Sequence, residues 1–273
     1  MRQEIKSRSF LSIISIAIVT LSVFFAAGSH VEAKSNSNKV DSELLKKGTL
    51  TVGLEGTYAP YSYRKNNKLT GFEVDLARQI AKKSHLKVKY VPTKWDSLIA
   101  GLGSKKFDVV LNDITITPQR QKQYLFSTPY IYSRGILITR SNDTSINSVS
   151  DIKGKKFAEG TGTNNETIAK KFGANTVPSG DFDTSLALVR EKRVDGTINA
   201  REAWFAYAKQ KSTKGLKYQV IPSSKAAAAK IGVLINKNSP KLQKQVNKAL
   251  KKLKANGTLT KLSKKYFGAD ITK

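Results

Sequence analysis

The chain alternates short apolar runs with amphipathic segments, and this alternation begins twice. Residues 50–54 form an apolar run, residues 72–81 carry apolar side chains at helical spacing, and residues 86–91, 95–102 and 107–111 follow as strand, helix and strand. Strands separated by helices pair in parallel, with helices on both faces of the sheet. The sequence therefore predicts an α/β fold with a parallel sheet in its first part.

A second series of strands and helices starts after Ser133. Its predicted strands are residues 135–139, 156–158 and 194–198, and its predicted helices are residues 164–172, 183–191 and 200–209, the middle one capped by Asp181 or Asp183. Residues 230–235 follow as a strand, and Pro240 opens a helix whose buried stripe is Leu242, Val246, Leu250 and Leu253. The pattern therefore predicts two doubly wound α/β lobes.

We expect the chain to cross between the lobes twice, near Thr139 and near Lys230. Lobe 1 then comprises residues 48–138 and 230–273, and lobe 2 comprises residues 139–229. Two crossing strands would form a hinge beside a cleft between the lobes.

The first 33 residues have the pattern of a secretory signal. Arg2, Lys6 and Arg8 make a basic start, residues 10–27 are largely apolar, and residues 31–33 end on a small side chain suited to cleavage. The alternative is an uncleaved membrane anchor, but Ser and Thr interrupt the apolar stretch and it is short for a span. We therefore predict residues 1–33 as a signal peptide and residues 34–47 as a flexible leader.

The composition is strongly basic and lacks cysteine. The 273 residues include 48 Lys and Arg against 20 Asp and Glu, a formal net charge of +28. A nucleic-acid partner is not expected, because the lysines are spread over many segments without a base-stacking motif and an export signal precedes them. With no Cys and only His30 and His85, we also expect no metal site, no cofactor and no enzymatic turnover.

The most informative motif, residues 112–120, directly follows the predicted strand 107–111. Ligands of open α/β sheets bind beyond the carboxyl ends of the strands. Four polar side chains fall there: Asp113, Thr115, Thr117 and Arg120. Hydroxyls, a carboxylate and a guanidinium together suit a zwitterion, because Arg can hold a carboxylate through two parallel hydrogen bonds. The alternative is a surface loop in which Arg120 and Asp113 pair with neighbours.

Aromatic side chains accompany two other strand ends. Tyr58 and Tyr61 lie in the turn that follows the first strand and begins with Glu55, and Trp95 lies two residues after Thr93. Their flat faces and polar rims can form the walls of a ligand cavity. Alternatively, all three pack between helix and sheet, which is also the position expected for Trp204.

Residues 160–164, Gly-Thr-Gly-Thr-Asn, precede a predicted helix of lobe 2. Backbone N–H groups at a helix start favour an anion, a carboxylate as readily as a phosphate. The segment lacks both the third glycine of the dinucleotide fingerprint and the Lys-Ser or Lys-Thr ending of a phosphate loop, so it does not indicate a nucleotide. His85, at a predicted helix end, is expected on the surface.

Six motifs occur in order: residues 53–61 (GLEGTYAPY), 71–77 (GFEVDLA), 92–96 (PTKWD), 115–120 (TITPQR), 126–130 (FSTPY) and 266–270 (YFGAD). Together they resemble the extracellular solute-binding proteins of polar amino-acid ABC importers (family 3), most closely the cystine-binding branch. The resemblance implies a periplasmic-binding-protein-like type II fold, with two lobes joined by a two-strand hinge, that closes on one amino acid and delivers it to a permease. It extends to basic, anchorless surface proteins of lactobacilli of the mucus- or collagen-binding type.

The resemblance also implies which residues contact the ligand. The aromatic walls are Tyr58, Tyr61 and Trp95. The residues that hold the α-carboxylate are Thr115, Thr117 and Arg120, with help from Gly162, Thr163 and Asn164. Glu55 corresponds to an acidic position near the ligand in relatives.

One position departs from the family pattern. The family usually has an Asp that holds the α-ammonium group where this chain has Ala200. An unpaired buried ammonium would cost about 3–5 kcal/mol. Asp113 is the natural substitute, with Glu202 and Glu55 as alternatives, so the departure bears on the ligand's identity rather than on the fold.

We therefore expect a non-enzymatic receptor that binds a polar amino acid, cystine first, for an ABC permease. The alternative, which can coexist with it, is a cationic surface adhesin for host mucin or collagen. Residues 234–273 hold 11 Lys against one acid, Asp270. Salt-sensitive attraction to anionic cell-wall polymers is therefore expected to retain the exported protein at the cell surface.

Overall fold

The computed structural model describes residues 40–273, so the predicted signal peptide and the start of the predicted leader lie outside the described residues. Residues 40–47, the rest of that leader, are part of the packed structure. Val40 is only 2% exposed, the 3-10 helix η1 spans Asp41–Glu43, and Lys46 bridges to Thr49. Within residues 40–273, none of the helices combines the length and the apolar character that crossing a membrane requires.

The first sheet has the strand order β4-β1-β5-β14-β6. Strand β1 (Thr49–Leu54) pairs in parallel with β4 (Lys87–Pro92) and β5 (Val109–Val110), and the helices α1 (Phe72–Lys83) and α2 (Trp95–Gly103) connect them. Leu50, Val52 and Leu54 belong to a core cluster with apolar side chains of α1, whereas Leu98 of α2 packs in a separate cluster with Phe107. This part of the prediction is confirmed, because strands and helices alternate as expected.

The two remaining strands of this sheet make it mixed rather than parallel, which corrects the expectation of a parallel sheet. Strands β6 (Tyr124–Phe126) and β14 (Leu234–Asn236) run antiparallel to their neighbours, because β14 enters the sheet on its return from the second one. The single strand predicted at residues 230–235 is in fact two, β13 (Ala229–Ile231) and β14. Gly232 lies at the break, and a Cβ there would approach the Ile116 side chain to 2.9 Å.

The second sheet has the order β10-β9-β11-β8-β12 and is also mixed. Its strands are β8 (Gly135–Arg140), β9 (Lys156–Glu159), β10 (Asn175–Pro178), β11 (Gly196–Ala200) and β12 (Leu216–Val220). Its helices are α4 (Asn164–Lys171), α5 (Phe182–Arg190) and α6 (Arg201–Ala208), with the 3-10 helix η2 (Val149–Ile152). Trp204 is buried and His85 exposed, as expected. Asp181 rather than Asp183 caps α5.

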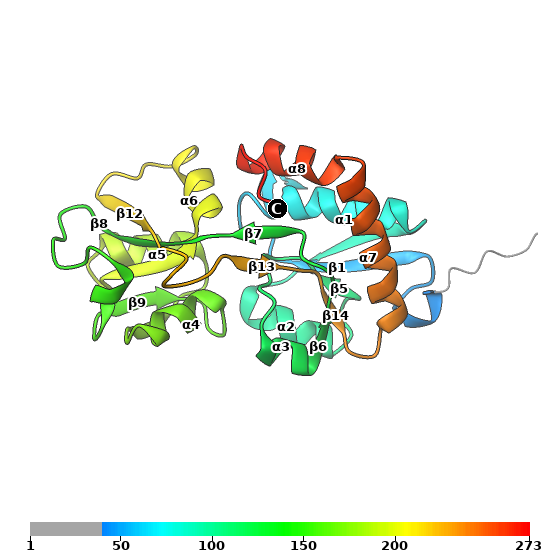
Figure 1. The fold of residues 1–273 in the computed structure, drawn as a ribbon, viewed down its shortest axis with the longest axis horizontal. Coiled ribbons are helices and arrows are strands. Elements are labelled where there is room, and N and C mark those ends of the chain that lie inside the picture. The colour runs from blue at the N-terminus through cyan, green and yellow to red at the C-terminus, as the bar shows by residue number, and fades with distance from the viewer. Residues whose placement is uncertain (1–39) are drawn as a thin grey trace, which may run out of the picture. The chain divides into compact units, whose positions relative to one another are not determined.

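Two strands lie between the sheets (Figure 1). Strand β7 (Ile131–Ser133) pairs antiparallel with β13, outside either five-stranded sheet. Strand β8 already belongs to the second sheet at Gly135, four residues before the crossing expected near Thr139. The division into residues 48–138 with 230–273 and residues 139–229 remains a proposal. Lobe 1 denotes the part built on the first sheet, and lobe 2 the part built on the second.

The remaining elements complete lobe 1. A hairpin of β2 (Tyr63–Lys65) and β3 (Lys68–Thr70) precedes α1, and the short helix α3 (Pro118–Gln123) precedes β6. Helix α7 (Pro240–Ala255) buries the predicted stripe and Ala249. Helix α8 (Thr258–Phe267), which the sequence analysis did not predict, follows a left-handed turn at Gly257 (φ 73°) and buries Leu259 and Leu262. Both helices pack on α1 (Figure 1).

Candidate functional site

A cavity of about 770 Å³, including its open mouth, lies where the carboxyl ends of strands from both lobes meet. Lobe 1 contributes residues that follow β1, β4 and β5: Glu55, Thr57, Tyr58, Trp95, Asn112, Asp113, Thr115 and Arg120. Lobe 2 contributes Glu159, Gly160, Thr163, Asn164, Asn165, Ser179, Gly180, Asp181, Phe182, Ser185, Thr197 and Asn199. Eight of the predicted site residues therefore share one cavity: Glu55, Tyr58, Trp95, Asp113, Thr115, Arg120, Thr163 and Asn164.

Arg120 is the cation of this cavity, and α3 positions it. Its Nη1 donates to the backbone oxygen of Thr115 at 2.9 Å, and its Nη2 donates to the backbone oxygen of Gly162 in lobe 2, also at 2.9 Å. The guanidinium carbon lies 5.9 Å from the centre of the Trp95 ring. Burial lowers the pKa of Arg120 from its ordinary value while the Asp113 charge opposes this, so the guanidinium stays charged with further N–H donors free for a ligand.

Among residues 40–273, three hydrogen bonds join the lobes across the cavity. Besides the bond from Arg120, Trp95 Nε1 donates to the backbone oxygen of Thr161 at 2.8 Å, and the Tyr58 hydroxyl donates to Asn199 Oδ1 at 2.6 Å. Each comes from a residue of lobe 1 that lines the cavity. The structure is therefore a closed arrangement, in which the same side chains that would contact a ligand also hold the two lobes together.

Four predicted site residues do not line the cavity: Tyr61, Thr117, Gly162 and Glu202. Tyr61 is fully buried and stacks on Tyr58, with 5.0 Å between the ring centres. Glu202 is 5% exposed and accepts a hydrogen bond from Ser133 of β7 while pairing with Arg201.

Thr117 and Gly162 act on Arg120 rather than on the cavity. Thr117 caps α3, since its hydroxyl oxygen accepts from the Arg120 backbone N–H at 3.2 Å. Gly162, at φ 73°, presents its backbone oxygen to the guanidinium. Its N–H donates to Glu166 Oε2, and the Glu166 N–H donates to Oγ1 of Thr163, the N-cap residue of α4. The loop thus has fewer free N–H groups for an anion than the sequence analysis expected.

Asp113 has a buried carboxyl oxygen close to the Tyr61 hydroxyl. Its backbone takes a left-handed conformation (φ 51°), and its N–H donates to Glu73 Oε1 at 2.8 Å. Within residues 40–273, neither the buried Asp113 Oδ1 nor the Tyr61 hydroxyl oxygen has a hydrogen bond of ordinary geometry, although the Tyr61 hydroxyl acts to lower the pKa of Asp113. Burial and the charge of Glu73 raise the pKa of Asp113 well above its usual range. A buried acceptor that lines a cavity and has no hydrogen bond of ordinary geometry is a candidate ligand contact.

Two further carboxylates in the cavity are perturbed by burial. Asn112 Nδ2 donates to Glu55 Oε2 at 2.6 Å, but burial prevails and raises the pKa of Glu55 to about 7. Glu159, at the end of β9, accepts from the Ile198 N–H at 2.7 Å, and burial raises its pKa well above the ordinary value. Glu159, Ser179 and Asn199 were not predicted, although Glu159 and Asn199 directly follow the predicted strands 156–158 and 194–198.

The described residues contain no group of side chains suited to a metal ion. Among the described residues, no group of His, Cys, Asp or Glu side chains is arranged to hold a metal ion. Arg120 is also the one basic side chain among the described residues that line the cavity. What the cavity can do is bind a small polar molecule through one guanidinium, several carboxyl groups and aromatic walls.

Two mixed α/β sheets, two connecting strands and a cavity at the strand ends of both lobes define a ligand-binding protein of the periplasmic type II class. The chain belongs to the bacterial extracellular solute-binding proteins, family 3, whose family model matches residues 50–269. Members of this family are non-enzymatic transport components, and this chain is accordingly not an enzyme.

Similar proteins come from several bacteria. A probable amino-acid ABC transporter-binding protein of Haemophilus influenzae is 37% identical over 94% of this chain and 96% of its own length. The L-cystine-binding protein TcyA of Bacillus subtilis is likewise 37% identical over 94% of this chain and 96% of its own. A solved structure from work on glutathione import via GshT and the cystine ABC importer TcyBC of Streptococcus mutans matches with TM-score 0.76 and 31% identity, over 82% of this chain and 97% of that one.

Proposed function

We propose that the protein is the substrate-binding component of an ABC importer for a polar amino acid, with cystine as its first ligand. The observation that carries this proposal is the pair formed by Arg120 and Asp113 in one cavity. A half-buried guanidinium with further N–H donors suits an α-carboxylate, and a buried carboxyl oxygen that lacks a hydrogen bond of ordinary geometry suits an α-ammonium. The names of the relatives that bind L-cystine support the choice of ligand.

In this proposal, residues of both lobes contact the ligand. Arg120 and Thr115 hold the α-carboxylate, with Thr163 and Asn164 from lobe 2, and Tyr58 and Trp95 form apolar walls. Asp113 takes the ammonium in place of a residue at position 200, where the buried Ala200 side chain has no polar atom to offer. Tyr61 packs against Tyr58, and Thr117 and Gly162 hold Arg120 in place, without contacting the ligand themselves. The partner that receives the ligand is an ABC permease.

Isothermal titration of residues 34–273 with L-cystine and a panel of amino acids tests the proposal. We expect saturable binding of cystine and at least tenfold weaker binding of most other amino acids. Thermal shift provides a second readout, because a ligand at 100 times its dissociation constant adds about 2.7 kcal/mol to the free energy of unfolding. No heat and no shift with any amino acid would overturn the proposal.

We also propose that lysine-rich surfaces retain the exported protein on anionic cell-wall polymers. Support comes from α7, whose lysines are all exposed and, within residues 40–273, form no ion pair: Lys241, Lys244, Lys248, Lys251, Lys252 and Lys254. The adhesin alternative is not carried further, because no feature of the described residues points to mucin or collagen in particular.

A further inference from the structure

Three of the four large apolar side chains that are exposed among residues 40–273 lie together on lobe 2. Phe205 of α6 is 42% exposed, and Tyr218 and Val220 of β12 are 40% and 42% exposed. The rings of Phe205 and Tyr218 meet edge to face, with 5.6 Å between their centres. Single exposed apolar side chains are common on protein surfaces, whereas a cluster of them indicates a contact with a partner. Phe205, Tyr218 and Val220 form one such apolar surface, the α6–β12 face.

The packing of α6 on the sheet holds these three side chains outward. Strand β12 is the edge strand of the second sheet and pairs only with β8 (Figure 1). Leu216, Tyr218 and Val220 alternate to the same side of this strand, and Leu216 is buried in the core cluster that contains Trp204 of α6. The Trp204 ring also supports Tyr218, with 5.7 Å between the ring centres. The α6–β12 face therefore continues the core of lobe 2 to the surface.

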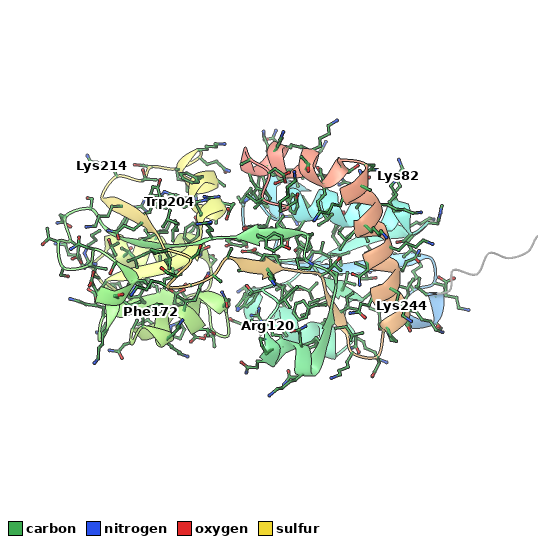
Figure 2. The ribbon with its side chains drawn as sticks, viewed as in Figure 1. Lys82, Arg120, Phe172, Trp204, Lys214 and Lys244 are labelled. Atoms are coloured by element: carbon green, nitrogen blue, oxygen red, sulfur yellow. The ribbon has the colours of Figure 1, made fainter. Side chains whose placement is uncertain are left out.

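Basic side chains flank this face. Residues 201–220 comprise α6, β12 and the loop between them, and their one acid, Glu202, is 5% exposed and pairs with Arg201. Their basic residues number five: Arg201, Lys209, Lys211, Lys214 and Lys217. Arg201 and Lys209 lie four residues before and after Phe205, on the same side of the helix. Lys214 extends from the loop (Figure 2).

Part of this positive charge has no partner. Lys211 pairs with Asp183 of α5 at 2.6 Å, but within residues 40–273 Lys209 and Lys214 belong to no ion pair. A second copy of this chain, with its net charge of +28, would be repelled. The charge of the α6–β12 face is therefore complementary to an anionic partner.

We propose that the α6–β12 face docks the protein on an anionic lipid bilayer. Phe205, Tyr218 and Val220 enter the boundary between head groups and acyl chains, and Lys209 and Lys214 reach the head-group phosphates with their long side chains. A bilayer fits these apolar side chains because they project from a helix and an edge strand, whereas a protein partner would need a pocket for its anchor residues. The surface is separate from the amino-acid site, since none of the three apolar residues lines the ligand cavity.

Co-sedimentation of residues 34–273 with lipid vesicles tests the proposal. Vesicles of phosphatidylglycerol and phosphatidylcholine in equal parts should bind the protein, and vesicles of phosphatidylcholine alone should bind it at least about tenfold more weakly, because the lysines then meet no anionic surface. In about 0.5 M NaCl a measurable part of the binding to the anionic vesicles should persist, since salt screens charges but does not weaken apolar burial. Complete release at this salt concentration would overturn the inference, because the attraction would then be electrostatic alone.

Variants test the assignment to particular residues. Phe205→Ala and Tyr218→Ala should each lower the salt-resistant binding about tenfold, because each removes an aromatic ring from the bilayer contact. Leu45→Ala is the matched control, since Leu45 is an exposed apolar side chain of lobe 1, and it should bind like the wild type. Calorimetric titration with cystine should give the same affinity for all three variants and the wild type, which shows that they fold and keeps this inference distinguishable from the proposed function. Wild-type vesicle binding by folded Phe205→Ala protein would overturn the inference.

The alternative occupant is an acidic peptide that adds a strand to the free edge of β12. A soluble copolymer of Glu and Tyr is the probe for it. Binding of this copolymer by the wild type but not by Phe205→Ala, together with unchanged vesicle binding by that variant, would assign the face to a peptide and overturn the lipid proposal.

Discussion

Arg120 shows how one side chain can serve both the ligand and the closure of the lobes. Its guanidinium already donates to a backbone oxygen in each lobe, at Thr115 and Gly162. Donors remain for a carboxylate, and Trp95 shields the group from water on one side. In such a desolvated position each charge-assisted hydrogen bond contributes about 1.5–3 kcal/mol.

Replacement of Arg120 should therefore remove amino-acid binding. We expect Arg120→Ala to weaken cystine binding at least about a hundredfold, because two charge-assisted bonds are lost together. Arg120→Lys should still lose about tenfold, since an ammonium cannot form two parallel bonds. Calorimetric titration measures both, and retention of wild-type affinity by Arg120→Ala would contradict the assignment.

Glu73 predicts a pH dependence of stability. It is fully buried, receives hydrogen bonds from the Tyr130 hydroxyl and the Asp113 N–H, and burial raises its pKa from 4.5 to about 7. The folded protein therefore holds this proton more tightly than the unfolded chain does. The resulting stability is complete below pH 4.5 and is lost as the pH rises through about 7.

Glu73→Gln should remove this dependence. The free energy of unfolding of the variant minus that of the wild type should rise by about 2–3 kcal/mol from pH 5 to pH 8, because most of the change caused by a pKa of about 7 in the folded protein falls in this range. Urea unfolding at a series of pH values measures the difference. A difference that stays constant across this range would mean that Glu73 titrates normally.

At the scale of residues, the strand-end rule predicts where the site lies but not every side chain in it. Tyr58 and Tyr61 are three residues apart in one turn, yet one lines the cavity and the other stacks behind it. That choice depends on how the turn packs against Phe267, which is far away in sequence. Glu159 directly follows a predicted strand, but only the folded chain shows that β9 and β1 end at the same cavity.

At the scale of elements, a single ring joins β1 to α2. Phe107 is almost fully buried, and it lies so close to both elements that a Cβ on Gly53 or on Gly101 would approach its ring to 2.7 Å. Glycine at these two positions therefore allows the helix to pack tightly on the sheet. This contact positions Trp95, at the start of α2, over the cavity.

Gly101→Ala should be destabilising by about 1–3 kcal/mol, because the added methyl group overpacks the space beside Phe107. Gly103→Ala is the control on the same helix, where the new Cβ would lie 3.6 Å from the Tyr124 hydroxyl oxygen, an ordinary contact. It should be neutral or slightly stabilising. Urea unfolding distinguishes the two, and equal stability of both variants would contradict this account of the packing.

The sequence predicted helices correctly where apolar residues recur at helical spacing along the whole helix, as in α1 and α7. It failed where the direction of a strand, or a break within it, depends on residues that are distant in the sequence. The antiparallel direction of β14 follows from the path of the chain through lobe 2, which no local pattern encodes. The edge strand β12 was missed because its alternating residues include the exposed Tyr218 and Val220.

At the scale of the whole molecule, basic side chains cover the exterior, whereas carboxyl groups outnumber basic groups in the cavity. Exposed lysines occur on both lobes and on the terminal helices, as Lys82, Lys214 and Lys244 illustrate (Figure 2). The cavity lining carries four carboxyl groups against one guanidinium. Surface charge and ligand choice are thus separate properties, which different experiments can address.

If charge retains the protein on the cell wall, salt should release it. We expect a wash with concentrated LiCl or NaCl to detach the protein from intact cells, because salt screens attraction between exposed charges. Quantitative immunoblotting of wash and cell fractions measures the release. Replacing the α7 lysines by Gln should lower the salt concentration needed, whereas persistence of the wild type through the wash would refute retention by charge.

The lysine-covered exterior also bears on how fast a ligand arrives. A ligand with net positive charge, such as lysine, approaches against the field of a +28 chain, and this repulsion extends over about one Debye length, roughly 8 Å at physiological ionic strength. Its association rate in stopped-flow fluorescence should therefore increase with salt, while that of zwitterionic cystine should stay nearly constant. The exterior would then act as a kinetic filter that admits electrically neutral amino acids ahead of cationic ones.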